Sequence, residues 1–183
     1  MTIIVAPFSN SDIRDWPAEH FAAAIGHLAD AWPGRIRVIG TANQRLRARD
    51  IVRQHDPDRV SNECGRIAWP QVVRELEAAT CVIGNNSGVA HLAGRFGVPT
   101  LCVFSGSHQR LEWRPLGTSV VTLTRSIGCS PCHFDHGSSC PFDKACLRLI
   151  TPRLVADTAL ALIAERARAT AADAATPAQQ ELA

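Results

Sequence analysis

The segment Asn85–Gly88 combines residue types that suit the binding of an anion. Two asparagines precede a serine that can cap a helix and a glycine that lets a ligand approach the backbone. If a helix begins here, the N–H groups of its first turn favour a phosphate or diphosphate. His91 lies four residues after Ser87, on the same helical face, where its imidazole could donate to a phosphate oxygen. Alternatively, Ser87 is an ordinary helix cap and His91 a half-buried histidine with a protein partner.

A second polar loop, Ser9–Asp15, follows the first apolar run of the chain. Arg14 in this loop carries a planar guanidinium, whose geometry matches that of a phosphate. A solvated surface arginine is the alternative interpretation. Asp12 and Asp15 are loop carboxylates that we expect to be surface or capping groups, so the residues themselves identify no general base.

Four of the seven cysteines lie within 18 residues of one another. They are Cys129, Cys132, Cys140 and Cys146. Four thiolates can form a tetrahedral shell, and a CxxC turn is the usual half-site for Zn²⁺ or iron. Because the segment has little apolar content, metal–ligand bonds would stabilise it, and a structural Zn or Fe site is the leading hypothesis. Unligated or redox-labile thiols and disulfides are the alternatives, and His133 and His136 could act as substitute ligands.

The other cysteines, Cys64, Cys81 and Cys102, stand alone in the sequence. Cys81 and Cys102 lie inside apolar, strand-like runs, where a thiol packs as a small hydrophobic side chain. We therefore expect core thiols at these positions. Separately, we expect no organic cofactor.

The composition is that of a globular protein of one domain. Of the 183 residues 46% are hydrophobic and 20% are charged, with a formal charge of +2. Without a basic run or an interleaved aromatic ladder, there is no electrostatic footprint for nucleic acid. The first residues indicate a buried strand rather than a signal peptide, and no run is long enough for a transmembrane segment. We expect a cytoplasmic protein, and a place at the inner face of the cytoplasmic membrane stays open.

Short β-branched runs alternate with helical patterns along the chain. This alternation predicts an α/β fold with a doubly wound, Rossmann-like parallel sheet. The expected strands are 2–6, 35–39, 58–61, 80–84 and 100–104, with a weaker sixth at 119–123. The expected helices begin at about residues 17, 44, 69, 88 and 152.

Such a sheet would bring the two polar loops together. Ligands bind where the strand order reverses, and in the order 3-2-1-4-5 the first and fourth strands are neighbours at that point. Ser9–Asp15 and Asn85–Gly88 would then face one another across one crevice. The fingerprints GxGxxG after the first strand, GxxxxGK[ST] and GxSxG are absent, which argues against dinucleotide oxidoreductases, P-loop enzymes and α/β-hydrolases.

The order of these motifs resembles family 9 glycosyltransferases, the heptosyltransferases. The string VIGNNSGVAHLAGRFGVPTLCVF is similar to the family's sugar-nucleotide motif, "I.NDSG..HLA..LG.PT...FG". SNSDIRDWPAEHFAAAI resembles its "K.WP...F..L" segment, with Arg14 at the position of a phosphate-binding lysine. The likeness continues through RLEWRPLG and CSPC…CP…ACLRLITP and covers roughly residues 3–163.

The resemblance implies one half of a GT-B architecture, in which two Rossmann-like domains enclose the active site. This sequence matches the C-terminal half, which binds ADP-heptose or a related nucleotide sugar for inverting transfer to a lipopolysaccharide-core or other glycan acceptor. By the same resemblance, the donor-binding residues would be Ser9, Arg14, Asn86, Ser87, Gly88 and His91. Ser9 and Arg14 would contact the diphosphate, and Asn86 would face the sugar. Residues 1–168 would form this donor domain, including the cysteine-rich segment 129–146, and 169–183 a disordered tail.

The sequence departs from the family pattern at three places. Asn86 replaces an aspartate, Gln44 stands near where many members place a glutamate on the ribose, and 105–108 (SGSH) replaces "GPTD". In the family, the other domain supplies the acceptor surface and the catalytic base. The alternative function is therefore a non-catalytic nucleotide-sugar or metal-binding module, which needs a separate N-terminal-domain chain.

Overall fold

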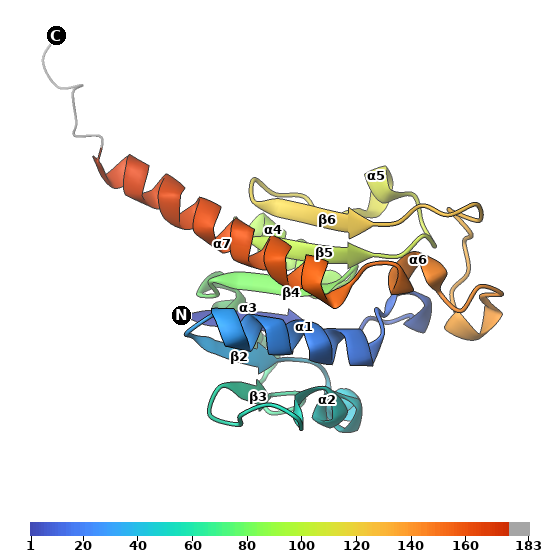
Figure 1. Cartoon of the computed structure of the whole chain (residues 1–183), viewed down its shortest axis with the longest axis horizontal. Coiled ribbons are helices and arrows are strands. Elements are labelled where there is room, and N and C mark those ends of the chain that lie inside the picture. Colours follow the sequence, from blue (N-terminus) through green and yellow to red (C-terminus); the bar gives the residue numbers. More distant parts are fainter. Residues whose placement is uncertain (176–183) are drawn as a thin grey trace, which may run out of the picture.

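The computed structural model describes residues 1–175 and shows one parallel six-stranded sheet (Figure 1). The strand order is β3-β2-β1-β4-β5-β6. The strands are β1 (Thr2–Ala6), β2 (Arg35–Val38), β3 (Val60–Asn62), β4 (Cys81–Asn85), β5 (Thr100–Phe104) and β6 (Val120–Thr124). The order reverses between β1 and β4, which confirms the predicted doubly wound topology and its switch point.

Helices cover both faces of this sheet. Helices α1 (Ala18–Ala31) and α7 (Pro152–Ala175) lie side by side on one face, with α3 (Trp69–Glu77) and α4 (Gly88–Arg95) on the other (Figure 1). The remaining helical elements are η1 (Asp12–Arg14), η2 (Ala42–Gln44), α2 (Arg45–Val52), α5 (Arg110–Trp113), η3 (Gly137–Ser139) and α6 (Ala145–Arg148). None of the helices described for residues 1–175 is long and apolar enough to cross a membrane.

Alternating side chains of β1 divide the core into two layers. Ile3 and Val5 pack into the cluster that α1 and α7 cover, whereas Ile4 and Ala6 pack into the cluster beneath α3 and α4. Burial on both faces explains why these strands appear in the sequence as unbroken apolar runs. The register pairs Ala6 with Gly84, so the loops that follow β1 and β4 leave the sheet at the same level.

The structure differs from the sequence expectations at the end of helix α7 and in its short helical elements. Helix α7 continues to Ala175, so residues 169–175 are helical where a disordered tail is expected. Alanine-rich sequence has the highest intrinsic helix propensity, which favours continuing a helix that is already anchored. The remaining residues, 176–183, lie outside the described part of the chain. The short elements η1, η2, η3, α5 and α6 have too few residues to show a helical period.

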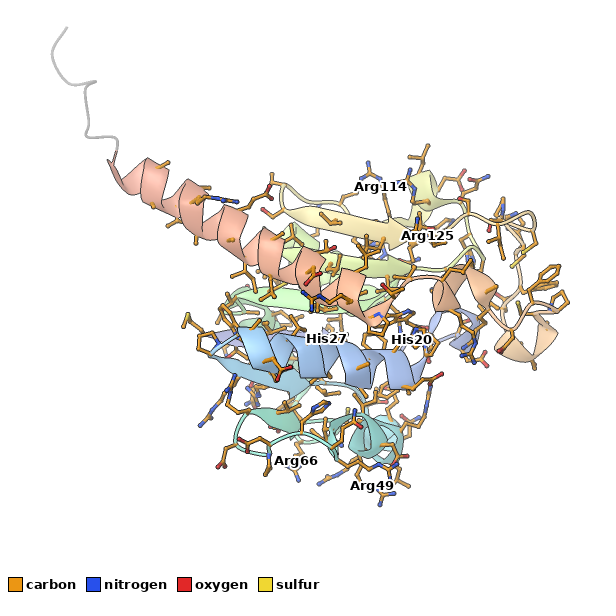
Figure 2. All side chains as sticks on the ribbon, in the orientation of Figure 1. His20, His27, Arg49, Arg66, Arg114 and Arg125 are labelled. Carbon is orange, nitrogen blue, oxygen red and sulfur yellow. The ribbon has the colours of Figure 1, made fainter. Side chains whose placement is uncertain are left out.

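Arginine side chains lie at opposite edges of the molecule. Arg49 and Arg66 lie on the β3 side, whereas Arg114 and Arg125 lie on the β6 side (Figure 2). These four cations therefore do not gather on one face, which matches the nearly balanced charge of the sequence.

Candidate functional site

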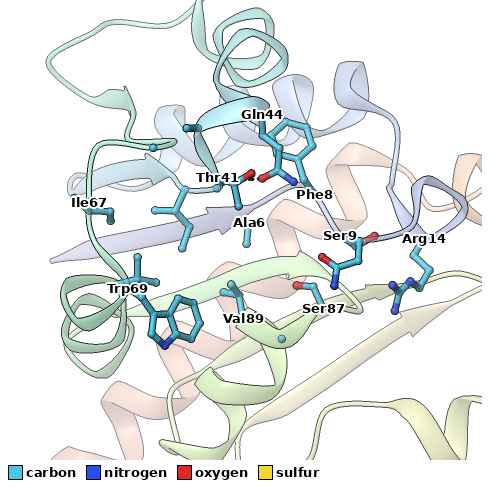
Figure 3. A pocket seen from close by; sticks show the side chains of 17 residues that line it. Ala6, Phe8, Ser9, Arg14, Thr41, Gln44, Ile67, Trp69, Ser87 and Val89 are labelled. Atoms are coloured by element: carbon cyan, nitrogen blue, oxygen red, sulfur yellow. Dashed lines mark hydrogen bonds between the residues drawn. The ribbon is translucent and has the colours of Figure 1, made fainter.

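A cavity of about 500 Å³ opens at the carboxyl ends of β1, β2 and β4 (Figure 3). Its polar side chains are Ser9, Asn10, Arg14, Thr41, Gln44 and Ser87. Its apolar side chains include Phe8, Ile39, Ile67, Trp69, Val72 and Val89. Ligand sites of doubly wound sheets lie at this position, so the cavity is the candidate site.

Two buried polar atoms at one end of the cavity lack a hydrogen-bond partner among the described residues. They are Nε of Arg14, in the loop after β1, and Oγ of Ser87, in the loop after β4. Ser87 occupies the N-cap position of α4, with φ −145° and ψ 167°, but its side chain makes no capping bond. Ser87 is therefore not an ordinary side-chain cap, and its hydroxyl is available to a ligand.

The side chain of Asn85, which is fully buried, ties the two loops together. Its Oδ1 accepts the N–H of Trp16 at 3.0 Å, and its Nδ2 donates to the carbonyl of Pro7 at 2.7 Å. The loops 9–15 and 85–88 therefore face one another at the switch point, as the sequence predicts.

Asp15 shapes the loop that carries Arg14. Its Oδ1 accepts the backbone N–H of Ser9 at 2.7 Å and the hydroxyl of Ser9 at 2.8 Å. Its Oδ2 forms an ion pair with Arg47 at 3.1 Å. Asp15 is therefore neither the surface group nor the helix cap that we expect from the sequence: it is buried, and its two oxygens bind Ser9 and Arg47.

Asn86 and His91 bind each other rather than lining the cavity. Oδ1 of Asn86 is 3.0 Å from Nε2 of His91, and neither residue lines the cavity. Burial lowers the pKa of His91, and the nearby positive charge of Arg14 lowers it further. The half-buried histidine with a protein partner is thus what the structure shows, and Ser9, Arg14, Ser87 and Gly88 are the predicted residues that line the cavity.

The opposite end of the cavity is apolar and contains residues that sequence reasoning missed. Trp69, at the start of α3, is 59% exposed, and Ile67 and Val89 accompany it (Figure 3). Gln44, noted as a departure from the family pattern, lines the cavity between the two ends, and its Oε1 accepts the N–H of Thr41 at 2.9 Å. Trp69 stands at the start of a predicted helix, but no pattern in the sequence indicates that its indole faces a cavity.

The predicted four-cysteine metal group is not assembled. No group of three or more His, Cys, Asp or Glu side chains within residues 1–175 is arranged to hold a metal ion. The sulfurs have separate partners instead: Cys146 accepts the N–H of Gly106, and Cys140 accepts that of Lys144, both at 3.3 Å. Burial raises the pKa of Cys146, and the neighbouring thiols Cys140 and Cys132 raise it further, so these sulfurs are nonetheless near one another.

Gly106 joins the loop after β5 to this cysteine-rich segment. Besides its bond to Cys146, its carbonyl accepts the N–H of Cys132 at 3.1 Å. A Cβ at position 106 would lie 2.3 Å from Oγ of Ser130, so only glycine fits without a rearrangement. The segment is therefore packed closely on the end of the sheet.

The three isolated cysteines are core thiols, as predicted. Burial raises the pKa of Cys64 to about 11 and that of Cys81 and Cys102 to about 12. All seven cysteines of the chain are free thiols in the structure.

The chain is similar to solved heptosyltransferase structures over most of its length. ADP-heptose LPS heptosyltransferase II of E. coli shares 18% identity with it at a TM-score of 0.74, with 91% of this chain and 47% of that chain covered. A family 9 glycosyl transferase from Veillonella parvula shares 18% identity at a TM-score of 0.72, with 90% and 46% covered. The iron-containing dodecameric glycosyltransferase TibC from enterotoxigenic E. coli shares 21% identity at a TM-score of 0.68, with 91% and 47% covered.

This chain thus spans about half the length of those proteins, and its sheet corresponds to one Rossmann-like half of a GT-B architecture. No curated protein matches it in sequence. The model of glycosyltransferase family 9 (heptosyltransferase) matches residues 1–143, a region that contains both loops at the polar end of the cavity. The chain therefore belongs to glycosyltransferase family 9.

Proposed function

We propose that this chain is the donor-binding half of a glycosyltransferase that uses ADP-heptose or a related nucleotide sugar. Two buried atoms without a hydrogen-bond partner, Nε of Arg14 and Oγ of Ser87, carry the proposal. They lie at one end of a cavity whose other end is apolar. A nucleoside diphosphate has the same two-ended character, with charged phosphates at one end and a flat base at the other.

The diphosphate would lie between Arg14 and the first turn of α4, where a cation, a hydroxyl and free backbone N–H groups converge. The base would stack on the indole of Trp69, and the ribose would lie beside Thr41 and Gln44. The Asn86–His91 pair would support the sugar end of the site.

Catalysis would rest on orientation and on stabilising the departing diphosphate with Arg14 and the start of α4. A separate N-terminal-domain chain, or a further half of the protein, would supply the acceptor surface and the catalytic base. The acceptor would be a hydroxyl of a lipopolysaccharide core or another glycan, which would bring the protein to the inner face of the cytoplasmic membrane.

Isothermal titration with ADP and ADP-heptose tests donor binding, and a transfer assay with a glycan acceptor tests turnover. Binding together with turnover supports the enzyme. Binding without turnover favours the alternative, a nucleotide-sugar module that needs a partner chain. Absence of any binding to the folded chain would refute both functions.

A second proposal is that the cysteine-rich segment 129–146 binds structural iron or zinc. Four thiols suit these metals, and backbone N–H groups already donate to the sulfurs of Cys140 and Cys146, as they do around ligated thiolates. Iron or zinc would draw the four sulfurs together from the separate partners that Cys140 and Cys146 have in the structure.

Elemental mass spectrometry of the purified protein, before and after a chelator, tests the metal proposal. We expect about one metal ion per chain, and its loss in a variant with Cys129→Ser and Cys132→Ser. A content below about 0.2 ions per chain before chelation would refute it.

A further inference from the structure

The cysteine-rich segment is hydrogen-bonded to the loop that carries Arg14, more than a hundred residues earlier in the chain. The N–H of Gly137 donates to Oδ1 of Asp12 at 2.9 Å, and the hydroxyl of Ser11 donates to the carbonyl of Asp135. Contacts between η1 and η3 accompany these bonds (Figure 1). The cysteine-rich segment and the loop that contains η1 therefore stabilise each other.

Lys144 makes the central contacts between them. Its Nζ donates to the carbonyl of Asp12 at 3.2 Å and to that of Asp15 at 3.1 Å. Asp12 is the first residue of η1 and Asp15 directly follows its last, so these carbonyls lie on either side of Arg14 in the chain. The carbonyl of Asp12 also accepts the N–H of Asp15 within η1, so the ammonium group is its second donor.

The backbone of Lys144 is fixed independently of this contact. Its N–H donates to the sulfur of Cys140 at 3.3 Å, and its φ of 53° places it in the left-handed region. Lys144 is also the only lysine in a sequence whose Lys and Arg residues together number 19. Its flexible stem and three donors can bind two carbonyls at once, whereas the planar guanidinium matches carboxylates and phosphates.

The η1 turn is held by its own backbone bonds, by the side chain of Asp15 on Ser9 and by that of Asn85 on Trp16, besides the contacts of Lys144. Three residues form it, and two backbone bonds close it: the N–H of Arg14 to the carbonyl of Ser11 at 3.0 Å and the N–H of Asp15 to that of Asp12 at 3.2 Å. Nε of Arg14 has no partner in the described residues, so no hydrogen bond of this nitrogen fixes the guanidinium, whose placement starts from the backbone of η1.

We propose that Lys144 is a positioning residue for the nucleotide diphosphate: it holds η1 so that Arg14 points into the cavity. Lys144 does not line the cavity, so its effect on a ligand passes through Arg14. The inference rests on the proposed function and adds that the cysteine-rich segment sets the affinity for the diphosphate.

Lys144→Met, which keeps the length and apolar character of the side chain but removes its donors, tests the proposal. We expect ADP to bind about tenfold more weakly by calorimetry, since a small misplacement of a binding group is costly. We expect adenosine, which lacks phosphates, to bind as it does to the unaltered chain, as measured by ligand-observed NMR. Arg148→Ala is the matched control, because this neighbouring cation binds Glu19 and Asp143 rather than η1.

A double-mutant cycle with Arg14→Ala identifies the route of the effect. If Lys144 acts through Arg14, Lys144→Met causes no further loss of ADP affinity once Arg14 is alanine. Full additivity, an unchanged ADP affinity in Lys144→Met, or equal weakening of ADP and adenosine would each overturn the inference while leaving the proposed function intact. If the unaltered chain binds neither compound, the proposed function fails and this inference fails with it.

Discussion

Oδ1 of Asn86 lies 3.0 Å from Nε2 of His91, so a residue of the turn between β4 and α4 is paired with a residue in the first half of α4. An amide oxygen accepts from the protonated nitrogen of a neutral imidazole. Burial and Arg14 lower the pKa of His91, which favours that neutral form. The family pattern places an aspartate where this chain has Asn86.

Asn86→Asp would therefore change the charge of the pair. We expect the pKa of His91 to rise, because a carboxylate stabilises the imidazolium form. A pH titration of the histidine ring signals by NMR measures the change, with the exposed Asn43→Asp as the charge-matched control. An unchanged His91 titration in Asn86→Asp would show that the 3.0 Å contact does not persist in solution.

The pH dependence of stability should reflect His55 and His91. Burial lowers the pKa of both below the ordinary 6.5, so each binds protons more readily in the unfolded chain. Their contribution to stability is present above pH 6.5 and is lost as the pH falls through the folded pKa. Urea unfolding at pH 7.5 and pH 5 measures this loss, and His55→Gln should reduce it whereas the exposed His27→Gln should not.

Ser87→Ala should affect ligand binding more than stability. Replacing a serine that caps a helix usually costs about 0.5–2 kcal/mol, but Oγ of Ser87 makes no capping bond, so we expect a smaller loss of unfolding free energy. ADP should bind roughly two- to tenfold more weakly, the effect of one lost hydrogen bond.

Thr151→Ala is the matched control for Ser87→Ala. Oγ1 of Thr151 accepts the N–H of Leu154 at 3.3 Å at the start of α7, so this variant should lose stability of about 1 kcal/mol without a change in ADP affinity. Equal destabilisation by the two variants would contradict the interpretation of Ser87 as a ligand-binding hydroxyl.

Trp69→Ala should weaken binding at the opposite end of the cavity. Stacking of a base on an aromatic side chain contributes about 1–3 kcal/mol, so ADP and adenosine should both lose affinity by a factor of roughly five to a hundred. Pyrophosphate, which has no base, should bind as before. Trp113→Ala removes a similarly exposed indole, 52% accessible, outside the cavity and should change none of these affinities.

The sheet and the two polar loops were predictable because their signals are local. Apolar runs such as Ile3–Ala6 mark strands that are buried on both faces, and topology rules then place the loops after β1 and β4 together. The cluster of four cysteines could equally be identified from the sequence. Their sulfurs, however, are held by amides of the 105–108 loop and of Lys144, which no spacing rule in the sequence specifies.

The remaining features depend on contacts between distant segments. Trp69 enters the site only because α3 packs beside β1 and β4, and Lys144 reaches Asp12 across 132 positions of sequence. His91 lies four residues after Ser87, at helical spacing, but its side chain binds Asn86, and neither of these two residues lines the cavity. The spacing of residues along a helix predicts which side chains share a face. The packing of the helix against its neighbours decides what those side chains contact.

Gly106 has a consequence for sequence change within the family. The family pattern "GPTD" places proline at this position, where this chain has glycine. A proline here would have no N–H to donate to Cys146, and its ring would meet the Ser130 hydroxyl that already excludes a Cβ. A proline at position 106 would therefore require the cysteine-rich segment to shift away from the loop that follows β5.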